Sequence, residues 1–253
     1  MALATYIENL ELADSEEVGA QRRGPVETPA PPMVIPAELE AAVNAGSLLS
    51  FVEGLSGPEK EDVLYSVQFA QRAASKAFDR FAETRNWYRK YGEVLEALGW
   101  TTEQFAFVAK DQSEGDFRMD KEALSIISAI STKNQLAVIT KSIEALSKLA
   151  DGDGPLSIFD FQTSTEDAGN FQIGAVQKAA NGSLNMALGA FYFRAAQRRR
   201  KFLFFSWGGA QVNFYTAAQK LTFNTTLYGQ VREQVLTKLG AQASKYIGEI
   251  SLD

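Results

Sequence analysis

The sequence predicts an α+β fold: an antiparallel sheet of four or five strands packed by amphipathic helices, with a proline-rich N-terminal arm. One observation is that apolar residues recur at three- and four-residue steps across much of residues 37–151, which is the spacing of amphipathic helices. Another is that short aromatic and β-branched runs, separated by Gly, Asn and Asp, fill residues 156–223, as is typical of strands joined by turns. A chain of 253 residues with 45% hydrophobic content can bury its own core, so we place one domain at residues 37–253.

An extended arm is predicted over residues 1–36. Its segment GPVETPAPPMVIP contains five of the seven prolines. Proline fixes φ and removes a backbone donor, so an extended or polyproline-like chain is expected. Two interpretations stay open: the arm is a flexible leader, or it packs along the folded body with Met33, Val34 and Ile35 as its apolar anchor.

Helices are predicted in succession over residues 37–151. The first covers AELEAAVNAGSLLSFVEGL. Ser56, Pro58 and Glu59 then have the spacing of a capping box with an early proline, which begins a second helix. Its apolar stripe continues for about 40 residues, a span of roughly 60 Å, so we expect a break or kink near Gly92.

Two further helices are predicted before residue 151. One begins at Thr101. The other begins at Asp120 and runs to the turn DGDGP, with an interruption near Ser131.

The predicted sheet occupies residues 156–223, and a helix over residues 224–247 closes the chain. Asn181 and Gly182 form a hairpin turn dipeptide. The strand at Met186–Phe193 and the strand KFLFFSW are apolar on both faces, so each needs cover on both sides. The predicted strands are LSIFDFQ, GNFQIGAVQ, SLNMALGAFYFRAA, KFLFFSW and QVNFYTAAQKLTFN.

The chain contains no histidine and no cysteine. A Ser-His-Asp triad, a Cys-His pair, a disulfide and a His or thiolate metal site are therefore excluded. The turn DGDGP lacks the later ligands of a calcium loop and is interpreted as a helix stop. We expect no metal and no cofactor other than a bound fatty acyl chain, for which the two apolar strands would form the floor of a cavity. The alternative is a sheet covered by helices on both faces.

The net charge of −6 and the pI of about 5.0 argue against nucleic acid as a partner, because phosphate neutralisation needs a basic surface. The first residues carry acid early and lack a basic start followed by an apolar stretch, so no signal peptide is expected. No apolar run approaches the roughly 18 residues of a membrane span. We expect the protein in the cytoplasm of the producing cell, or exported without a cleavable signal, and associated with membrane.

The most unusual segment joins a run of four cations to a run of large apolar side chains. Such a junction suits a lipid–water interface, where cations meet anionic headgroups and rings lie at the acyl boundary. Two alternatives stay open: a hairpin whose tip is a basic turn beside a buried aromatic strand, and a contact with an acidic partner. The residues predicted to contact membrane or lipid are Arg198, Arg199, Arg200, Lys201, Phe202, Phe204, Phe205 and Trp207.

The acidic helical first half, the segment FYFRAAQRRRKFLFFSWGG and the closing helix resemble the Erwinia virulence factor (Evf) family. Its members are bacterial proteins that promote persistence in an insect gut. The resemblance implies an α+β fold and membrane association through a lipid attached to a cysteine, with the acyl chain in a hydrophobic tunnel. Because this chain has no cysteine, no lipidation residue is carried over. Three alternatives stay open: the tunnel binds a free lipid, the membrane role rests on rings and cations, or that role is lost.

The predicted function is that of a non-enzymatic bacterial virulence-type factor, which associates with membrane or lipid through the apolar sheet and the basic hairpin. One alternative is a pore-forming or toxin-like protein whose long helix and apolar hairpin rearrange to insert. A second alternative is a small-ligand binder or hydrolase that uses carboxylates, Ser or Lys.

Overall fold

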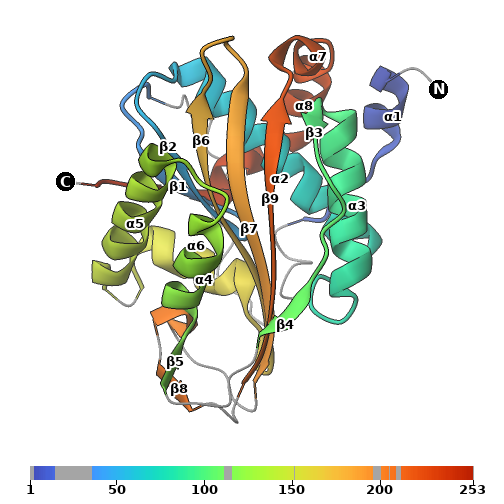
Figure 1. Cartoon of the computed structure of the whole chain (residues 1–253). Coiled ribbons are helices and arrows are strands. Elements are labelled where there is room, and N and C mark those ends of the chain that lie inside the picture. The colour runs from blue at the N-terminus through green and yellow to red at the C-terminus, as the bar shows by residue number, and fades with distance from the viewer. Residues whose placement is uncertain are drawn as a thin grey trace.

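The computed structural model describes residues 3–14, 36–110, 116–150, 152–195, 201–204, 206–208 and 212–252. Figure 1 shows a central sheet between two groups of helices, which gives three layers. One face is covered by α2 (Gly57–Ala77), α3 (Thr84–Ala97), α7 (Thr225–Gly229) and α8 (Arg232–Leu239). The other face is covered by α4 (Met119–Ser128), α5 (Lys133–Lys148) and α6 (Gly154–Thr163).

The central sheet has the strand order β10-β1-β2-β6-β7-β9-β3, and β4 also pairs with β9. All pairs are antiparallel except β2 with β6, which are parallel. The mixed architecture agrees with the predicted α+β class, and the sheet has more strands than the four or five expected. The strands are β1 (Ala41–Asn44), β2 (Ser47–Phe51), β3 (Trp100–Thr101), β4 (Val108–Lys110), β6 (Ala168–Lys178), β7 (Leu184–Ala195), β9 (Val212–Phe223) and β10 (Ile247–Ile250); β5 (Asp116–Arg118) and β8 (Ser206–Gly208) form a separate pair.

The antiparallel meander predicted at the centre of the sheet is confirmed by β6, β7 and β9. Its hairpin turn lies at the predicted dipeptide, where Gly182 has φ 84°. The side chain of Asn181 accepts a hydrogen bond from the backbone N of Ser183 at 3.1 Å. The turn chemistry thus sets the register between β6 and β7.

The first predicted helix is wrong, because its residues form the hairpin of β1 and β2. Every residue of both strands is buried, since helices cover both faces of the sheet here. The alternation that marks a half-buried strand is therefore absent, and the alanine-rich sequence has the composition of a helix. The turn between the strands contains Ala45, at φ 51°, and Gly46.

The predicted capping box is confirmed at the start of α2. The hydroxyl of Ser56 accepts from the backbone N of Glu59, and the Glu59 carboxylate accepts from the backbone N of Ser56. Two orphan donors of the helix start are thereby satisfied.

The break expected near Gly92 is wrong, because the helix is interrupted at residues 78–83 and Gly92 lies inside α3. The interruption is held by Asp79, whose Oδ1 accepts from the backbone N atoms of Phe81 (2.8 Å) and Ala82 (2.7 Å). Such a local bond offers the backbone an alternative to helical hydrogen bonding.

Two predicted strands are wrong. LSIFDFQ belongs to α6, which has Pro155 in its first turn and buries Leu156, Phe159 and Thr163 at three- and four-residue steps. KFLFFSW is not a single strand, because a 3-10 turn, η1 (Phe202–Phe204), precedes β8. The meander is therefore formed by fewer strands than predicted, and the sheet is completed by elements from both ends of the chain.

Other predicted boundaries differ as well. In place of one closing helix, α7, α8 and the 3-10 segment η2 (Gly240–Tyr246) lead into the edge strand β10. The helix expected from Thr101 is wrong, because residues 102–107 link β3 to β4 without a helix. The interruption expected near Ser131 is confirmed by the gap between α4 and α5.

The core lies in two clusters, one on each face of the sheet. Leu188 and Ala190 of β7 pack into the cluster under α2 and α3, whereas Phe191 and Phe193 pack into the cluster under α4, α5 and α6. The two-sided apolar character of β7 is thus explained by cover on both faces, which was one of the two interpretations of this strand.

The N-terminal residues that the structure describes pack against the body. Helix α1 (Leu3–Asn9) buries Ile7, and Lys238 of α8 donates to the backbone oxygen of Glu8. The proposed anchor of the arm, at residues 33–35, lies outside the described residues. In the described part of the chain, no helix combines the length and apolar character that crossing a membrane requires.

Candidate functional site

Four of the predicted lipid-contact residues lie in the described part of the chain. Phe202 and Trp207 are 1% and 2% exposed, and Phe204 is half-buried. The ring centroid of Phe202 lies 5.1 Å from that of Phe193. In the folded state Phe202 and Trp207 are therefore core residues, and their contact with lipid stays a prediction. The others, Arg198, Arg199, Arg200 and Phe205, lie outside the described residues.

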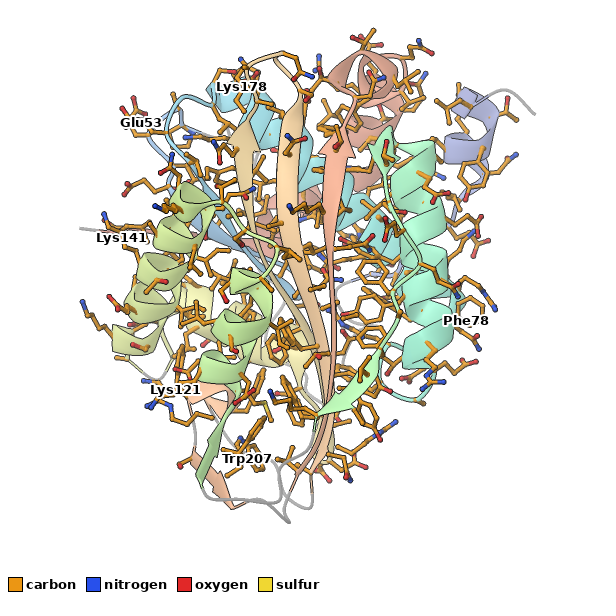
Figure 2. All side chains as sticks on the ribbon, viewed as in Figure 1. Glu53, Phe78, Lys121, Lys141, Lys178 and Trp207 are labelled. Atoms are coloured by element: carbon orange, nitrogen blue, oxygen red, sulfur yellow. The ribbon has the colours of Figure 1, made fainter. Side chains whose placement is uncertain are left out.

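Lys201, the last cation of the basic run, is tied to the helical layer. Its Nζ donates to the backbone oxygen of Leu149 at 2.6 Å, and its backbone N donates to Asp160 Oδ2 at 3.1 Å. The end of the basic run is thus fixed beside α5 and α6. Figure 2 shows Trp207 at the end of the molecule formed by β5 and β8.

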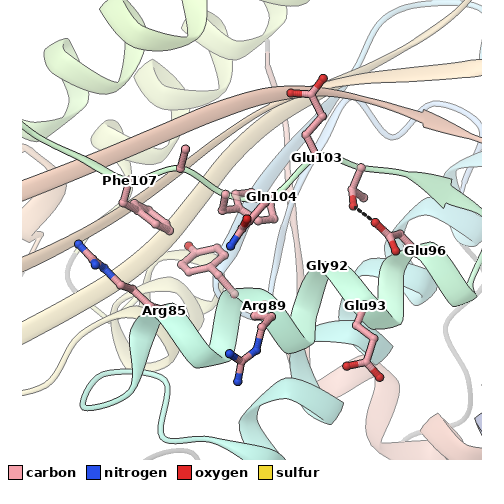
Figure 3. A pocket seen from close by; sticks show the side chains of 12 residues that line it. Arg85, Arg89, Gly92, Glu93, Glu96, Glu103, Gln104 and Phe107 are labelled. Atoms are coloured by element: carbon pink, nitrogen blue, oxygen red, sulfur yellow. Dashed lines mark hydrogen bonds between the residues drawn. The ribbon is translucent and has the colours of Figure 1, made fainter.

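A groove of about 730 Å³ lies elsewhere, between α3 and the link from β3 to β4. Figure 3 shows its two walls. Helix α3 is amphipathic: it buries residues such as Trp87 and Tyr91 and turns its polar residues outward. The α3 wall consists of Arg85, Tyr88, Arg89, Gly92, Glu93 and Glu96, and the opposite wall consists of residues 102–107.

The opposite wall is held at both ends. The hydroxyl of Thr102 donates to Glu96 Oε1 at 2.9 Å, and the backbone N of Glu103 donates to Gln219 Oε1 at 2.6 Å. Beyond the groove, Ala109 of β4 pairs with Tyr215 of β9. The wall therefore runs along the edge of the sheet with its position fixed by α3 and β9.

The floor of the groove continues into a row of rings from α3, the β3–β4 link and the sheet, of which Tyr88 is buried and the others are half-buried. The centroid of Phe107 lies 4.8 Å from that of Tyr88 and 4.9 Å from that of Tyr192. Tyr192 in turn stacks on Tyr215. Val108, which follows in the chain, is 66% exposed. We call Tyr88, Phe105, Phe107, Tyr192 and Tyr215 the aromatic row.

Tyr88 anchors this row in the interior. Its hydroxyl donates to Asn170 Oδ1 at 2.7 Å, and burial raises its pKa. The ring therefore contributes a neutral, fixed surface at neutral pH.

The charges of the groove are divided between its ends (Figure 3). Arg85 and Arg89 lie one turn apart, are exposed, and make no ion pair or side-chain hydrogen bond within the described residues. Glu93, by contrast, accepts from Lys90 (2.8 Å) and Tyr6 (2.7 Å). Although burial raises the pKa of Glu93, these two hydrogen bonds outweigh it and hold the pKa below its usual value.

This arrangement presents the guanidinium of Arg85 and, one turn along α3 and partly compensated by Glu93, that of Arg89 on a groove with aromatic walls, which suits anions that carry apolar groups. Within the described ranges, no group of three or more carboxylates is placed to hold a metal ion.

This groove was not predicted from the sequence. Phe105 and Phe107 stand in the alternating stretch FAFVAK, which is a strand pattern that the predicted helix at Thr101 obscured. No local signal links them to Tyr192 and Tyr215, because that contact depends on the pairing of β4 with β9.

The chain folds as a three-layer α+β domain with an aromatic groove of mixed charge at one edge of its sheet. Among solved structures, that of the Evf virulence factor is similar, with a TM-score of 0.39 and 13% identity over 94% of this chain and 90% of that chain. A delta-endotoxin is also similar, with a TM-score of 0.39 and 11% identity over 80% of this chain and 90% of that chain. The resemblance to the Evf family is thus a weak structural similarity, from which no function is argued. No protein-family model matches the chain, and no curated protein matches it significantly.

Proposed function

We propose that this protein is a non-enzymatic virulence- or toxin-type factor that associates with the surface of anionic lipid membranes. The observation that carries the proposal is the position of Arg85 and Arg89, which are exposed and make no ion pair or side-chain hydrogen bond within the described residues, beside the aromatic row. Aromatic side chains favour the headgroup level of a bilayer, and cations near an anionic surface contribute on the order of 1 kcal/mol each.

Residues close to the aromatic row support a membrane contact through this face of the protein. Arg194 shares its face of β7 with Tyr192, because the two residues are two positions apart, and it is exposed. The predicted contact residues Arg198, Arg199 and Arg200 follow Arg194 closely in the sequence. A chain with net charge −6 would then meet the membrane through a locally basic face.

The test is co-sedimentation with vesicles of phosphatidylcholine, with and without phosphatidylserine. The double variant Arg85→Gln/Arg89→Gln should lose about 2 kcal/mol of binding, or roughly thirtyfold in affinity, for the anionic vesicles only. Binding of the wild-type protein should also weaken with salt.

The matched control is Lys121→Gln/Lys141→Gln, which removes the same charge from the α4–α5 layer, on the side of the molecule away from α3 (Figure 2). This control should bind like the wild type. An equal loss of vesicle binding in both double variants would mean that net charge alone causes the effect. No binding by the wild-type protein would contradict the proposal. Release of an entrapped dye in the same experiment would favour the toxin-like alternative over simple association.

A further inference from the structure

Arg80, in the link between α2 and α3, is a buried cation without a buried anion. The residue is 4% exposed. Its guanidinium carbon lies 4.7 Å from the ring centroid of Trp87, and its Nη1 donates to Gln71 Oε1 at 3.3 Å. Nε and Nη2 are buried and have no hydrogen-bond acceptor, and no carboxylate pairs with the residue in the described chain.

The charge of Arg80 persists in this environment. Burial lowers its pKa to about 10, so the guanidinium is protonated at neutral pH. The groups around it, an amide oxygen, an indole ring and the hydroxyls of Tyr88 and Tyr91, are neutral. A buried charge that lacks a counter-charge is strongly unfavourable, so native structures pair such groups.

Other arginines of this chain show what the same edge of a guanidinium binds. Nε and Nη2 of Arg118 donate to the two carboxylate oxygens of Asp120 at 3.0 and 2.6 Å. Arg232 uses the same two atoms toward Asp62. This fork geometry matches a carboxylate or another small acceptor anion.

A further donor lies beside the fork of Arg80. Gln172 of β6 bonds through its backbone N to the oxygen of Gly46, the residue packed against the Arg80 guanidinium. The side-chain Nε2 of Gln172 is buried, makes no hydrogen bond of normal geometry, and lies near the hydroxyl of Tyr88. Donors from β6 and from the α2–α3 link thus lie near Gly46, and no acidic side chain of the described chain hydrogen-bonds to them.

We propose that Arg80, assisted by Gln172, binds a small monovalent anion, a halide or a small carboxylate such as formate. The anion acts as a buried counter-ion that holds the α2–α3 link against the β1–β2 hairpin. This proposal is independent of the membrane role.

Thermal unfolding of the full chain at constant ionic strength tests the proposal, with sodium chloride, bromide and formate compared with sodium gluconate. Small anions should raise Tm by about 3–5 °C at concentrations about tenfold above Kd, with a saturating dependence, and gluconate should not. Comparison of Tm in the halide salts with Tm in formate shows which of the two kinds of anion binds. The same Tm in all four salts would overturn the proposal.

Crystals grown with sodium bromide give a readout that needs no variant. An anomalous peak is expected within hydrogen-bond reach of Nε and Nη2 of Arg80. Water density alone at that position would contradict the proposal. Arg80→Met should abolish the response of Tm to small anions, whereas Lys141→Met, at an exposed position on α5, should keep it. An unchanged response in Arg80→Met would place the anion elsewhere, and if this variant fails to fold, the bromide density and the wild-type salt series still decide.

Discussion

The rings of Tyr192 and Tyr215 stack across β7 and β9, with centroids 4.4 Å apart and planes 9° from parallel. The two residues are direct register partners, and Phe107 meets Tyr192 edge-on. Both tyrosines are half-buried. Cross-strand pairing therefore holds Tyr192 and Tyr215 in a fixed position, so the proposed membrane contact requires no rearrangement of these two rings.

Replacement of Tyr192 by Ala is expected to weaken binding to phosphatidylserine-containing vesicles several-fold and to cost only about 1 kcal/mol in the free energy of unfolding. The reason is that the ring is half-buried, so part of its surface reaches solvent. Co-sedimentation and urea unfolding on the same preparations measure both effects. Leu236→Ala, which removes a 41% exposed apolar side chain from α8, should bind like the wild type. A similar loss in that control would argue against a specific aromatic surface.

Replacement of Phe202 by Ala is expected to have the opposite profile. Its ring is buried between those of Phe159, Phe171 and Phe193, so the free energy of unfolding should fall by about 3–5 kcal/mol. Vesicle binding per folded molecule should not change. Phe202→Leu should recover part of the stability. A variant of unchanged stability that fails to bind vesicles would show that this ring serves lipid contact rather than the core.

Sequence patterns predicted those elements of the fold whose signal is local. The capping box at Ser56 and the turn at Gly182 depend on a few adjacent residues, and both lie where expected. The β1–β2 hairpin and α6 were assigned to the wrong class because their periodicity is short or hidden by burial on both faces. The helix break depends on one side chain, that of Asp79, at a position without glycine or proline.

The candidate site was beyond sequence analysis for a different reason. Arg85 and Tyr88 were expected on a helix, yet nothing local indicates that residues 102–107 would lie against it. Lipid contact was predicted at residues 198–207 because the composition of this basic and aromatic run is unusual. The burial of Phe202 depends on Phe159 and Phe171, which belong to distant elements.

A side chain at Gly46 would force the buried guanidinium of Arg80 to shift. A Cβ at this position would lie 2.0 Å from Nη2 of Arg80, so Gly46→Ala is expected to cost about 1–3 kcal/mol through overpacking. Gly154→Ala, where a Cβ has no neighbour within 4 Å, is the control and should be neutral. In a double-mutant cycle, Arg80→Ala should remove most of the additional cost of Gly46→Ala, because the clash is gone. Additive costs, measured by urea unfolding, would be inconsistent with this contact.

The ion pair between Glu59 and Lys178 should make stability depend on pH in the acid range. Their charged atoms lie 2.6 Å apart, and Glu59 also accepts from Ser56 at the start of α2. Although burial raises the pKa of Glu59, these hydrogen bonds outweigh it and lower the pKa below its usual value. The folded-state pKa thus lies below the unfolded value, so the contribution of the charge is fully present above the unfolded pKa and is lost as pH falls through the folded pKa.

Glu59→Gln keeps the capping geometry and removes the charge, so it is expected to cost about 0.5–1 kcal/mol at pH 7. The difference from the wild type should shrink to about zero as pH falls toward about 3. Urea unfolding of both proteins over this pH range measures the difference. Glu53→Gln, which removes an exposed carboxylate just before α2, is the matched control and should differ little from the wild type at any pH. A Glu59→Gln difference that persists unchanged into acid would mean that the charge of Glu59 does not stabilise the start of α2.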